Sequence, residues 1–234
     1  MKRIDFIKPG TFSVQVAADS RRLEFDMKNE VVITNNVPVD FVFIGDSITH
    51  LWELDAYFGK KNCLILNRGI GGDTSEYVLK RFAADVLQLK PRYCVMHIGI
   101  NDSWVMEPDI WKENEGESIE FVEERVKNNL TQIVDLSLKN SQKLILCSIL
   151  PTKVITEQRC SERNEYIIKV NSYMKELCKD KGCIYVDYHL NFVKSDGITI
   201  KNGLTMEGLH PHVYGYNVMA DVLRTTLAQN GIEI

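Results

Sequence analysis

Short runs of apolar residues alternate with longer segments of helical periodicity over most of the chain. The runs lie at about residues 39–45, 63–67, 93–98, 143–149 and 183–187. Nearly continuous apolar runs separated by helix-length segments are typical of buried parallel strands joined by helices. We therefore expect an α/β fold with a five-stranded parallel sheet covered on both faces, right-handed crossovers and the flavodoxin-like strand order 2-1-3-4-5.

Four of the segments between or after these runs carry an apolar stripe at helical spacing. They lie within residues 73–89, 119–137, 166–177 and 213–228. Asp73 or Thr74 is expected to cap the first of these helices, and Gly182 ends the third. Because stripes of this kind normally pack against a core, we assign no chemistry to them.

The first 38 residues show a different pattern. Short patches lie at residues 12–16, 23–27 and 31–33, and the first two alternate between apolar and polar residues. Alternation indicates half-exposed strands, and residues 18–20 could turn a hairpin. We therefore predict an N-terminal extension over residues 1–38, a small β addition of short strands packed on one main domain that spans residues 39–234. Whether this extension covers a sheet edge or joins copies in a homo-oligomer stays open.

Composition narrows the class of partner. The chain of 234 residues is 44% hydrophobic and 26% charged, an ordinary globular composition, and its net charge is −4. Proteins that bind nucleic acids or anionic membranes generally carry a basic field, so neither partner is expected. No apolar run has the length of a signal peptide or of a bilayer span, so we expect a cytoplasmic protein.

Six cysteines are spread along the chain. They are Cys63, Cys94, Cys147, Cys160, Cys178 and Cys183. Most lie in or beside apolar runs, where a thiol acts as a small buried hydrophobe. None is spaced as Cys-x-x-Cys, so we predict free thiols and no structural metal.

A polar turn follows the first apolar run. In the stretch from Phe41 to His50, β-branched and aromatic residues end at Gly45, and Asp46 and Ser47 come next. This pattern predicts a buried strand, a tight turn and a helix that begins near Ser47. Taken alone, the turn indicates only a helix cap, with Asp46 favourable near the helix N-terminus.

Three further segments are expected at the same rim of the sheet. Residues 67–74 contain three glycines and follow the second strand, residues 99–102 follow the third, and residues 207–211 precede the last helix. Glycines allow tight turns and close approach of backbone N–H groups to a ligand. Since ligands of such sheets bind beyond the carboxyl ends of the strands, all four polar segments should meet at one crevice.

Each of these segments has a use if the reaction is acyl transfer. Ser47 would be the nucleophile, His210 the base within its reach, and Glu207 the carboxylate that orients and stabilises the imidazole. The backbone N–H groups of Ser47 and Gly72 and the side-chain amide of Asn101 would form a three-donor oxyanion hole. The sequence thus predicts a serine-based catalytic site.

Simpler interpretations of the same residues remain. His210 could cap or pack before the last helix, Asn101 could brace a turn, and His212 could replace His210 as the base. We expect Asp73 and Asp102 to be caps or turn braces rather than catalysts.

The four blocks together resemble the SGNH or GDSL family of serine esterases. The resemblance rests on Gly45-Asp46-Ser47, on Gly72 within residues 67–74, on Gly99-Ile100-Asn101-Asp102 and on residues 207–210, in the order of the family. It implies a three-layer α/β/α hydrolase with the catalytic roles given above and without metal or organic cofactor. Glu207 departs from the family pattern, which usually has Asp there; a dyad steered by a backbone carbonyl is the alternative.

Substrate preference is predicted more coarsely. Trp52, Trp104, Met106 and Trp111 follow the first and third blocks and could form an apolar or sugar-stacking wall, or pack in the core. No long apolar lid segment occurs, which favours a small ester with a short acyl group, such as an acetylated carbohydrate. Two alternatives are an acyltransferase with the same residues and a non-catalytic module that binds a small ligand, although no Gly-x-x-x-x-Gly-Lys-[Ser/Thr] phosphate loop is present.

Overall fold

The five predicted apolar runs form one parallel sheet. In the computed structural model, which describes residues 5–10, 16–60, 63–108, 115–154 and 158–234, the strand order is β2-β1-β3-β4-β5 and all neighbours are parallel. The strands are β1 (Phe41–Gly45), β2 (Ile65–Gly69), β3 (Tyr93–His97), β4 (Leu144–Cys147) and β5 (Ile184–Val186). The predicted strand order 2-1-3-4-5 is confirmed.

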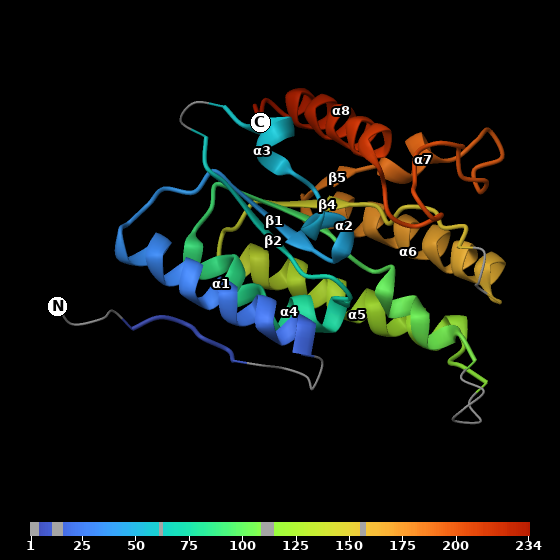
Figure 1. Ribbon diagram of the computed structural model, residues 1–234, viewed down its shortest axis with the longest axis horizontal. Coiled ribbons are helices and arrows are strands. Elements are labelled where there is room, and N and C mark those ends of the chain that lie inside the picture. The colour runs from blue at the N-terminus through green and yellow to red at the C-terminus, as the bar shows by residue number, and fades with distance from the viewer. Residues whose placement is uncertain (1–4, 11–15, 61–62, 109–114, 155–157) are drawn as a thin grey trace.

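Helices cover both faces of this sheet, which gives three layers (Figure 1). One face carries α4 (Ser75–Asp85), η1 (Leu87–Leu89), α5 (Ile119–Lys139) and α6 (Cys160–Lys181). The other carries α3 (Leu54–Phe58), α7 (Tyr188–Phe192) and α8 (Val213–Gln229). The four predicted helical stripes therefore lie in helices. Within the described residues, no helix is long and apolar enough to cross a membrane.

The strands are apolar throughout because both of their faces are buried. In β1, Val42 and Ile44 pack in the core under α4, α5 and α6, whereas Phe41 and Phe43 pack in the core under α3 and α8. Successive side chains of a strand point to opposite faces, so a strand between two helical layers needs apolar residues at every position.

The N-terminal cap of α4 comes from outside that helix. Thr74 occupies the cap position, but its side chain makes no capping hydrogen bond. Instead the Asp102 carboxylate accepts hydrogen bonds from the backbone N–H of Ser75 at 2.9 Å and from its hydroxyl at 2.6 Å. Thr74 is therefore the N-cap residue, as one of the two predicted candidates, but Asp102 supplies the capping hydrogen bonds and is a brace as expected.

The N-terminal extension is a helix, and the prediction of short strands there was wrong. Residues Val16–Thr34 form α1, which lies beside α4 near the β2 end of the sheet (Figure 1). Residues 12–15 of the first predicted patch lie outside the described residues. The prediction failed because α1 has the reverse of the usual amphipathic pattern of a surface helix. Polar residues occupy much of the buried face of α1, which comprises Arg22, Phe25, Asp26 and Asn29. Apolar residues point to solvent at Leu23, Met27 and Val31. A helix that buries charge has no apolar stripe for periodicity to detect.

The six cysteines are free thiols, as predicted. Burial raises the pKa of the Cys147 thiol to about 12, which keeps it in the protonated form. These residues therefore fill space in the core and beside it.

Candidate active site

Ser47 begins a short helix at the carboxyl end of β1, which lies between β2 and β3. The helix is α2 (Ser47–His50), and Asp46 caps it by accepting a hydrogen bond from the backbone N–H of Ile48 at 2.9 Å. The preceding Gly45 is required sterically, because a Cβ atom there would lie 2.1 Å from the carbonyl oxygen of His97. The tight packing of β1 against β3 thus determines where Ser47 emerges.

His210 links Ser47 to a carboxylate. Its Nε2 lies 2.9 Å from Ser47 Oγ, and its Nδ1 makes a short contact with Glu207 Oε1. The same carboxylate oxygen accepts the backbone N–H of His210 at 3.3 Å. Partial burial alone would raise the pKa of Glu207, but the hydrogen bond and charge of His210 outweigh it and lower that pKa. The structure brings the three predicted residues into one hydrogen-bonded line.

Backbone contacts hold the loop that carries Glu207 and His210. Gly208 has φ +94°, and its carbonyl accepts the N–H of Lys153 at 2.8 Å. A Cβ atom on Gly208 would lie 2.1 Å from the carbonyl oxygen of Lys153, so only glycine fits. His212 is the N-cap of α8, and its Nδ1 accepts the N–H of Tyr214. His212 is therefore occupied with the helix, and His210 is the imidazole that reaches Ser47.

The glycine-rich loop after β2 lies beside Ser47. A Cβ atom built on Gly71 would be 3.9 Å from Ser47 Cβ, and Ile70 donates its N–H to the carbonyl of Gly45 at 2.9 Å. Gly72 has φ +81° with open space around its Cα, so backbone conformation rather than crowding favours glycine there.

Asn101 is bound to the same loop. It is the first residue of η2 (Asn101–Met106), and its Nδ2 donates to the carbonyl of Asp73 at 2.9 Å. Its Oδ1 accepts a hydrogen bond from Trp104 Nε1 at 3.1 Å, and the Arg163 guanidinium stacks 4.2 Å above the Trp104 ring. A hydrogen bond thus links the predicted donor Asn101 to the glycine-rich loop that carries Gly72 and lies beside Ser47.

The predicted aromatic wall is largely absent from the described residues. Trp52 is 4% exposed and packs against Phe43, Phe58 and Tyr216, so it belongs to the core. Met106 is also buried. For these two residues the prediction of a substrate wall was wrong, because the end of η2 and the turn after α2 point them inward. Trp104 lies at the site through its bond to Asn101, and Trp111 lies outside the described residues.

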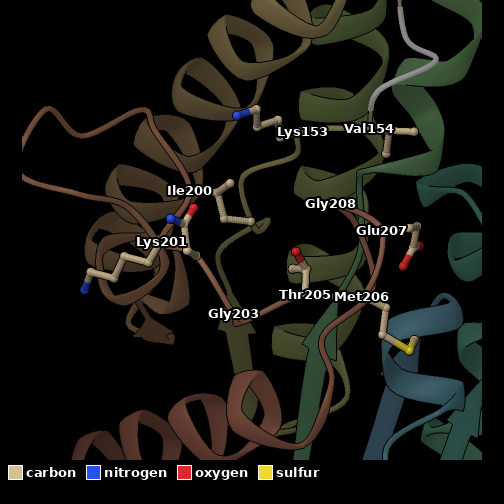
Figure 2. A pocket seen from close by; sticks show the side chains of 10 residues that line it. Lys153, Val154, Ile200, Lys201, Gly203, Thr205, Met206, Glu207 and Gly208 are labelled. Atoms are coloured by element: carbon tan, nitrogen blue, oxygen red, sulfur yellow. The ribbon is translucent and has the colours of Figure 1, made fainter.

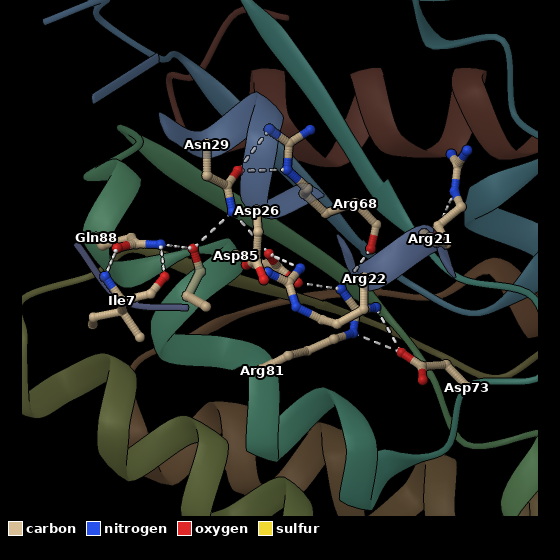
Figure 3. Close-up of polar contacts among 12 residues, drawn as sticks. Ile7, Arg21, Arg22, Asp26, Asn29, Arg68, Asp73, Arg81, Asp85 and Gln88 are labelled. Carbon is tan, nitrogen blue, oxygen red and sulfur yellow. Dashed lines mark hydrogen bonds and ion pairs between the residues drawn. The ribbon is translucent and has the colours of Figure 1, made fainter. Parts of the chain in front are cut away.

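The sequence interpretation missed a group of buried charges behind the glycine loop, shown in Figure 3. We call it the buried charge network; its members are Arg22, Asp26, Arg68, Asp73, Arg81 and Asp85. Burial raises the pKa of Asp73; burial alone would lower the pKa of Arg81, but Asp73 and Asp85 raise it. The one available signal was the pair Arg81 and Asp85, spaced i,i+4 in the middle of an apolar stripe.

A cavity of about 590 Å³ adjoins the loop that carries Glu207 (Figure 2). Polar side chains on its wall include Lys201, Asn202 and Thr205. In Figure 2, Glu207 and Lys201 extend to opposite sides of the loop. Its volume is within the range of small-ligand sites.

Among the residues that the structure describes, no three His, Cys, Asp or Glu side chains converge as metal ligands would.

The geometry joins a hydroxyl, an imidazole and a carboxylate with a loop rich in backbone donors. A base hydrogen-bonded to a serine hydroxyl can take its proton during attack on a carbonyl carbon, and the carboxylate stabilises the imidazolium that forms. Nearby N–H donors can bind the oxyanion of the tetrahedral intermediate. This chemistry is acyl transfer.

Comparison with known proteins agrees with this chemistry. The family model of the GDSL-like lipase/acylhydrolase family matches residues 43–218. A structure from Bacteroides fragilis, provisionally assigned as an acylhydrolase, is 26% identical with a TM-score of 0.70 and covers 89% of this chain and 96% of its own. A GDSL-like lipase from Bacteroides thetaiotaomicron is 25% identical with a TM-score of 0.69, over 88% of this chain and 99% of its own.

A curated relative matches over a shorter stretch. It is the uncharacterized lipoprotein YqeF of Bacillus subtilis, 36% identical over 90 residues, and the match spans 38% of this chain and 34% of that relative. The family model covers three quarters of the present chain and includes the turn of Ser47, the glycine loop, Asn101 and His210. The chain therefore belongs to the GDSL-like lipase/acylhydrolase family of carboxylic ester hydrolases.

Proposed function

We propose that this protein hydrolyses carboxylic esters through an acyl-enzyme on Ser47. The line from Ser47 Oγ through His210 to Glu207 carries the proposal. His210 Nε2 takes the serine proton as Oγ attacks the ester carbonyl, and the imidazolium then returns it to the leaving alcohol. Water then attacks the acyl-enzyme. His210 takes the proton of the water and passes it to Ser47 Oγ, so that the acid is released and Ser47 is regenerated.

The oxyanion is bound by the backbone N–H groups of Ser47 and Gly72 and by the Asn101 amide. Asn101 Nδ2 carries two hydrogens, and one of them is used by the carbonyl of Asp73. The other is free to donate to the negative oxygen that develops in the tetrahedral intermediate. The bond from Trp104 to Asn101 Oδ1 supports this assignment, because it keeps the NH₂ side of the amide toward the glycine loop.

The substrate that we propose is a small ester with a short acyl group. Lys201, Asn202 and Thr205 line the cavity that adjoins the Glu207 loop and can bind the hydroxyl groups of an alcohol, so acetylated sugars are the first class to test. A series of p-nitrophenyl esters from acetate to octanoate should show kcat/KM falling as the acyl chain lengthens. A rise with chain length would overturn the short-chain assignment.

Labelling with a fluorophosphonate tests the nucleophile without knowledge of the substrate. Reaction of Ser47 Oγ at phosphorus expels fluoride and leaves a stable phosphonyl ester, which peptide mapping locates. We expect one label on Ser47 and none in Ser47→Ala, with circular dichroism unchanged. Ser172→Ala, on the exposed side of α6, is the matched control and should label normally. Labelling that survives in Ser47→Ala would contradict the proposal.

The same catalytic residues could pass the acyl group to an alcohol instead of water. Product analysis with and without an added alcohol separates the two reactions. We expect the free acid to be the main product in both conditions. A new ester as the main product would reassign the protein as an acyltransferase.

A further inference from the structure

We propose that the buried charge network, anchored on α1, holds the segments on either side of Ser47 in place, and that Arg81 and Arg22 are positioning residues of the active site. This inference rests on the proposed function, since it assigns the network a part in catalysis. It also gives a role to the N-terminal helix, which lies before the residues matched by the family model.

Arg81 connects three points at the carboxyl edge of the sheet. Its Nη2 donates to the carbonyl of Gly45 at 3.1 Å, two residues before Ser47. Its Nη1 donates to the carbonyl of Arg68 in β2 at 2.8 Å, and its Nε donates to Asp73 Oδ2 at 2.7 Å. One rigid, planar guanidinium therefore sets the spacing between the turn of Ser47 and the glycine loop.

Two of the three proposed oxyanion donors, Gly72 and Asn101, depend on the position of Asp73. Gly72 precedes Asp73 directly, so its N–H moves with that residue. The carbonyl of Asp73 accepts the hydrogen bond from Asn101 Nδ2 at 2.9 Å. A shift of Asp73 away from Arg81 would displace both donors relative to Ser47.

Helix α1 holds Arg81 through Asp85. Arg81 Nη1 donates to Asp85 Oδ2 at 3.0 Å, and Arg22 on α1 pairs with Asp85 Oδ1 and with Asp26. Asn29, about two turns after Arg22 on α1, donates to Asp85 Oδ1 at 3.0 Å and accepts from Arg68. Figure 3 shows these side chains meeting between α1 and α4.

The network is charge-balanced and buried, so each of its members constrains the others. It contains three guanidinium groups and three carboxylates, and the side chains of Arg22, Arg81 and Asp85 are at most 2% exposed. Charges without water must be paired within the protein. If Arg22 were removed, Asp85 would compete with Asp73 and with the carbonyl of Gly45 for Arg81, and the glycine loop would lose part of its anchor.

Steady-state kinetics of Arg22→Met test the inference, because Met keeps the bulk of the side chain and removes its charge. With p-nitrophenyl acetate, at a temperature where circular dichroism shows folded protein, we expect kcat to fall about ten- to a hundredfold. We expect KM to change less than about threefold, because the loss concerns the transition state more than ground-state binding. Fluorophosphonate labelling of Ser47 should slow in parallel, and Arg22→Lys should recover most of the rate.

Met174→Ala is the matched control, since it removes fully buried atoms from α6 in the core of the same face, away from the network. It should lower the melting temperature and leave kcat within about twofold, because a core cavity acts on stability. Unchanged kcat in folded Arg22→Met, or an equal loss in Met174→Ala, would overturn the inference. If Arg22→Met does not fold, Arg81→Lys takes its place: a lysine keeps the charge, but its three N–H donors cannot serve the four acceptors of Arg81 together, and normal kcat would overturn the inference equally.

These outcomes separate the two proposals. A wild-type protein that neither hydrolyses esters nor reacts with the fluorophosphonate overturns the proposed function, and the catalytic role of the network falls with it. An active wild type with an equally active Arg22→Met overturns the positioning role alone.

Discussion

Trp104 fixes the orientation of Asn101 by donating its indole N–H to Asn101 Oδ1 at 3.1 Å. An amide held by its oxygen must present its NH₂ group elsewhere, here toward the carbonyl of Asp73 and the glycine loop. The stacked guanidinium of Arg163 keeps the indole ring in place. We therefore expect Trp104 to affect the proposed oxyanion hole through Asn101.

Replacement of Trp104 by Phe should lower kcat about three- to tenfold with little change in KM, because the neutral hydrogen bond that orients Asn101 is worth about 1 kcal/mol. Trp52→Phe is the matched control. Within the described part of the chain, Trp52 Nε1 has no hydrogen-bond partner, so this change removes no bond and should leave kcat unaltered. Steady-state kinetics of both variants decide the matter, and equal effects would remove the role of Trp104.

Gly72→Ala should lower both stability and activity. The φ of +81° disfavours any residue with a Cβ atom by about 1–2 kcal/mol, although nothing crowds the position. We expect relaxation of this strain to turn the N–H of residue 72 and to lower kcat at least about tenfold. Gly197→Ala carries the same kind of strain, at φ +72° in open space, and should lose stability with normal kcat. Urea unfolding and kinetics measure the two effects separately.

Glu207→Gln should lower kcat roughly a hundredfold or more. The amide keeps the shape of the side chain but cannot stabilise the imidazolium that His210 becomes, and it can hold the wrong tautomer. Glu207→Asp is expected to retain more activity than the amide, because it keeps the charge at the cost of one methylene of reach. Activity of Glu207→Gln equal to the wild type would favour a dyad in which a backbone carbonyl orients His210.

The stability of the protein should depend on pH through Asp46. Burial, and then the charges of Asp73 and Asp102, raise the pKa of the Asp46 carboxyl from 3.8 to about 7. The folded state therefore binds a proton more tightly than the unfolded chain does. This contribution is fully present below pH 3.8 and is lost as pH rises through about 7, so the free energy of unfolding should fall by roughly 2–3 kcal/mol between pH 5 and pH 8.

Urea unfolding of Asp46→Asn checks this contribution. The amide oxygen can still accept the N–H of Ile48, but the group no longer titrates, so the fall between pH 5 and pH 8 should be reduced. Asp196→Asn is the control: hydrogen bonds from Thr199 and Ile198 lower the pKa of Asp196 to about 2, and its contribution is lost only as pH falls through that value. It should change stability equally at pH 5 and pH 8. An unaltered slope in Asp46→Asn would contradict the assignment.

The local sequence pattern was sufficient to predict elements whose side chains are all apolar and all buried. The five strands are apolar on both faces because helices cover both faces, so their positions could be predicted from the runs alone. Parallel order then brought Ser47, the glycine loop and Asn101 to one rim, and the spacing of Glu207 and His210 added the base. The sequence by itself thus determined the sheet, its order and the hydrogen-bonded line of Ser47, His210 and Glu207.

Tertiary structure decided the features that depend on a partner distant in the chain. Helix α1 buries Arg22, Asp26 and Asn29, and these polar residues are stable there only because Arg68, Arg81 and Asp85 of other elements neutralise and hydrogen-bond them. Trp52 is buried because β1, α3 and α8 surround it with aromatic rings. The hydrophobic pattern of a sequence indicates which apolar residues are buried. It does not indicate which charged residues form ion pairs, because pairing depends on distances that only the folded chain determines.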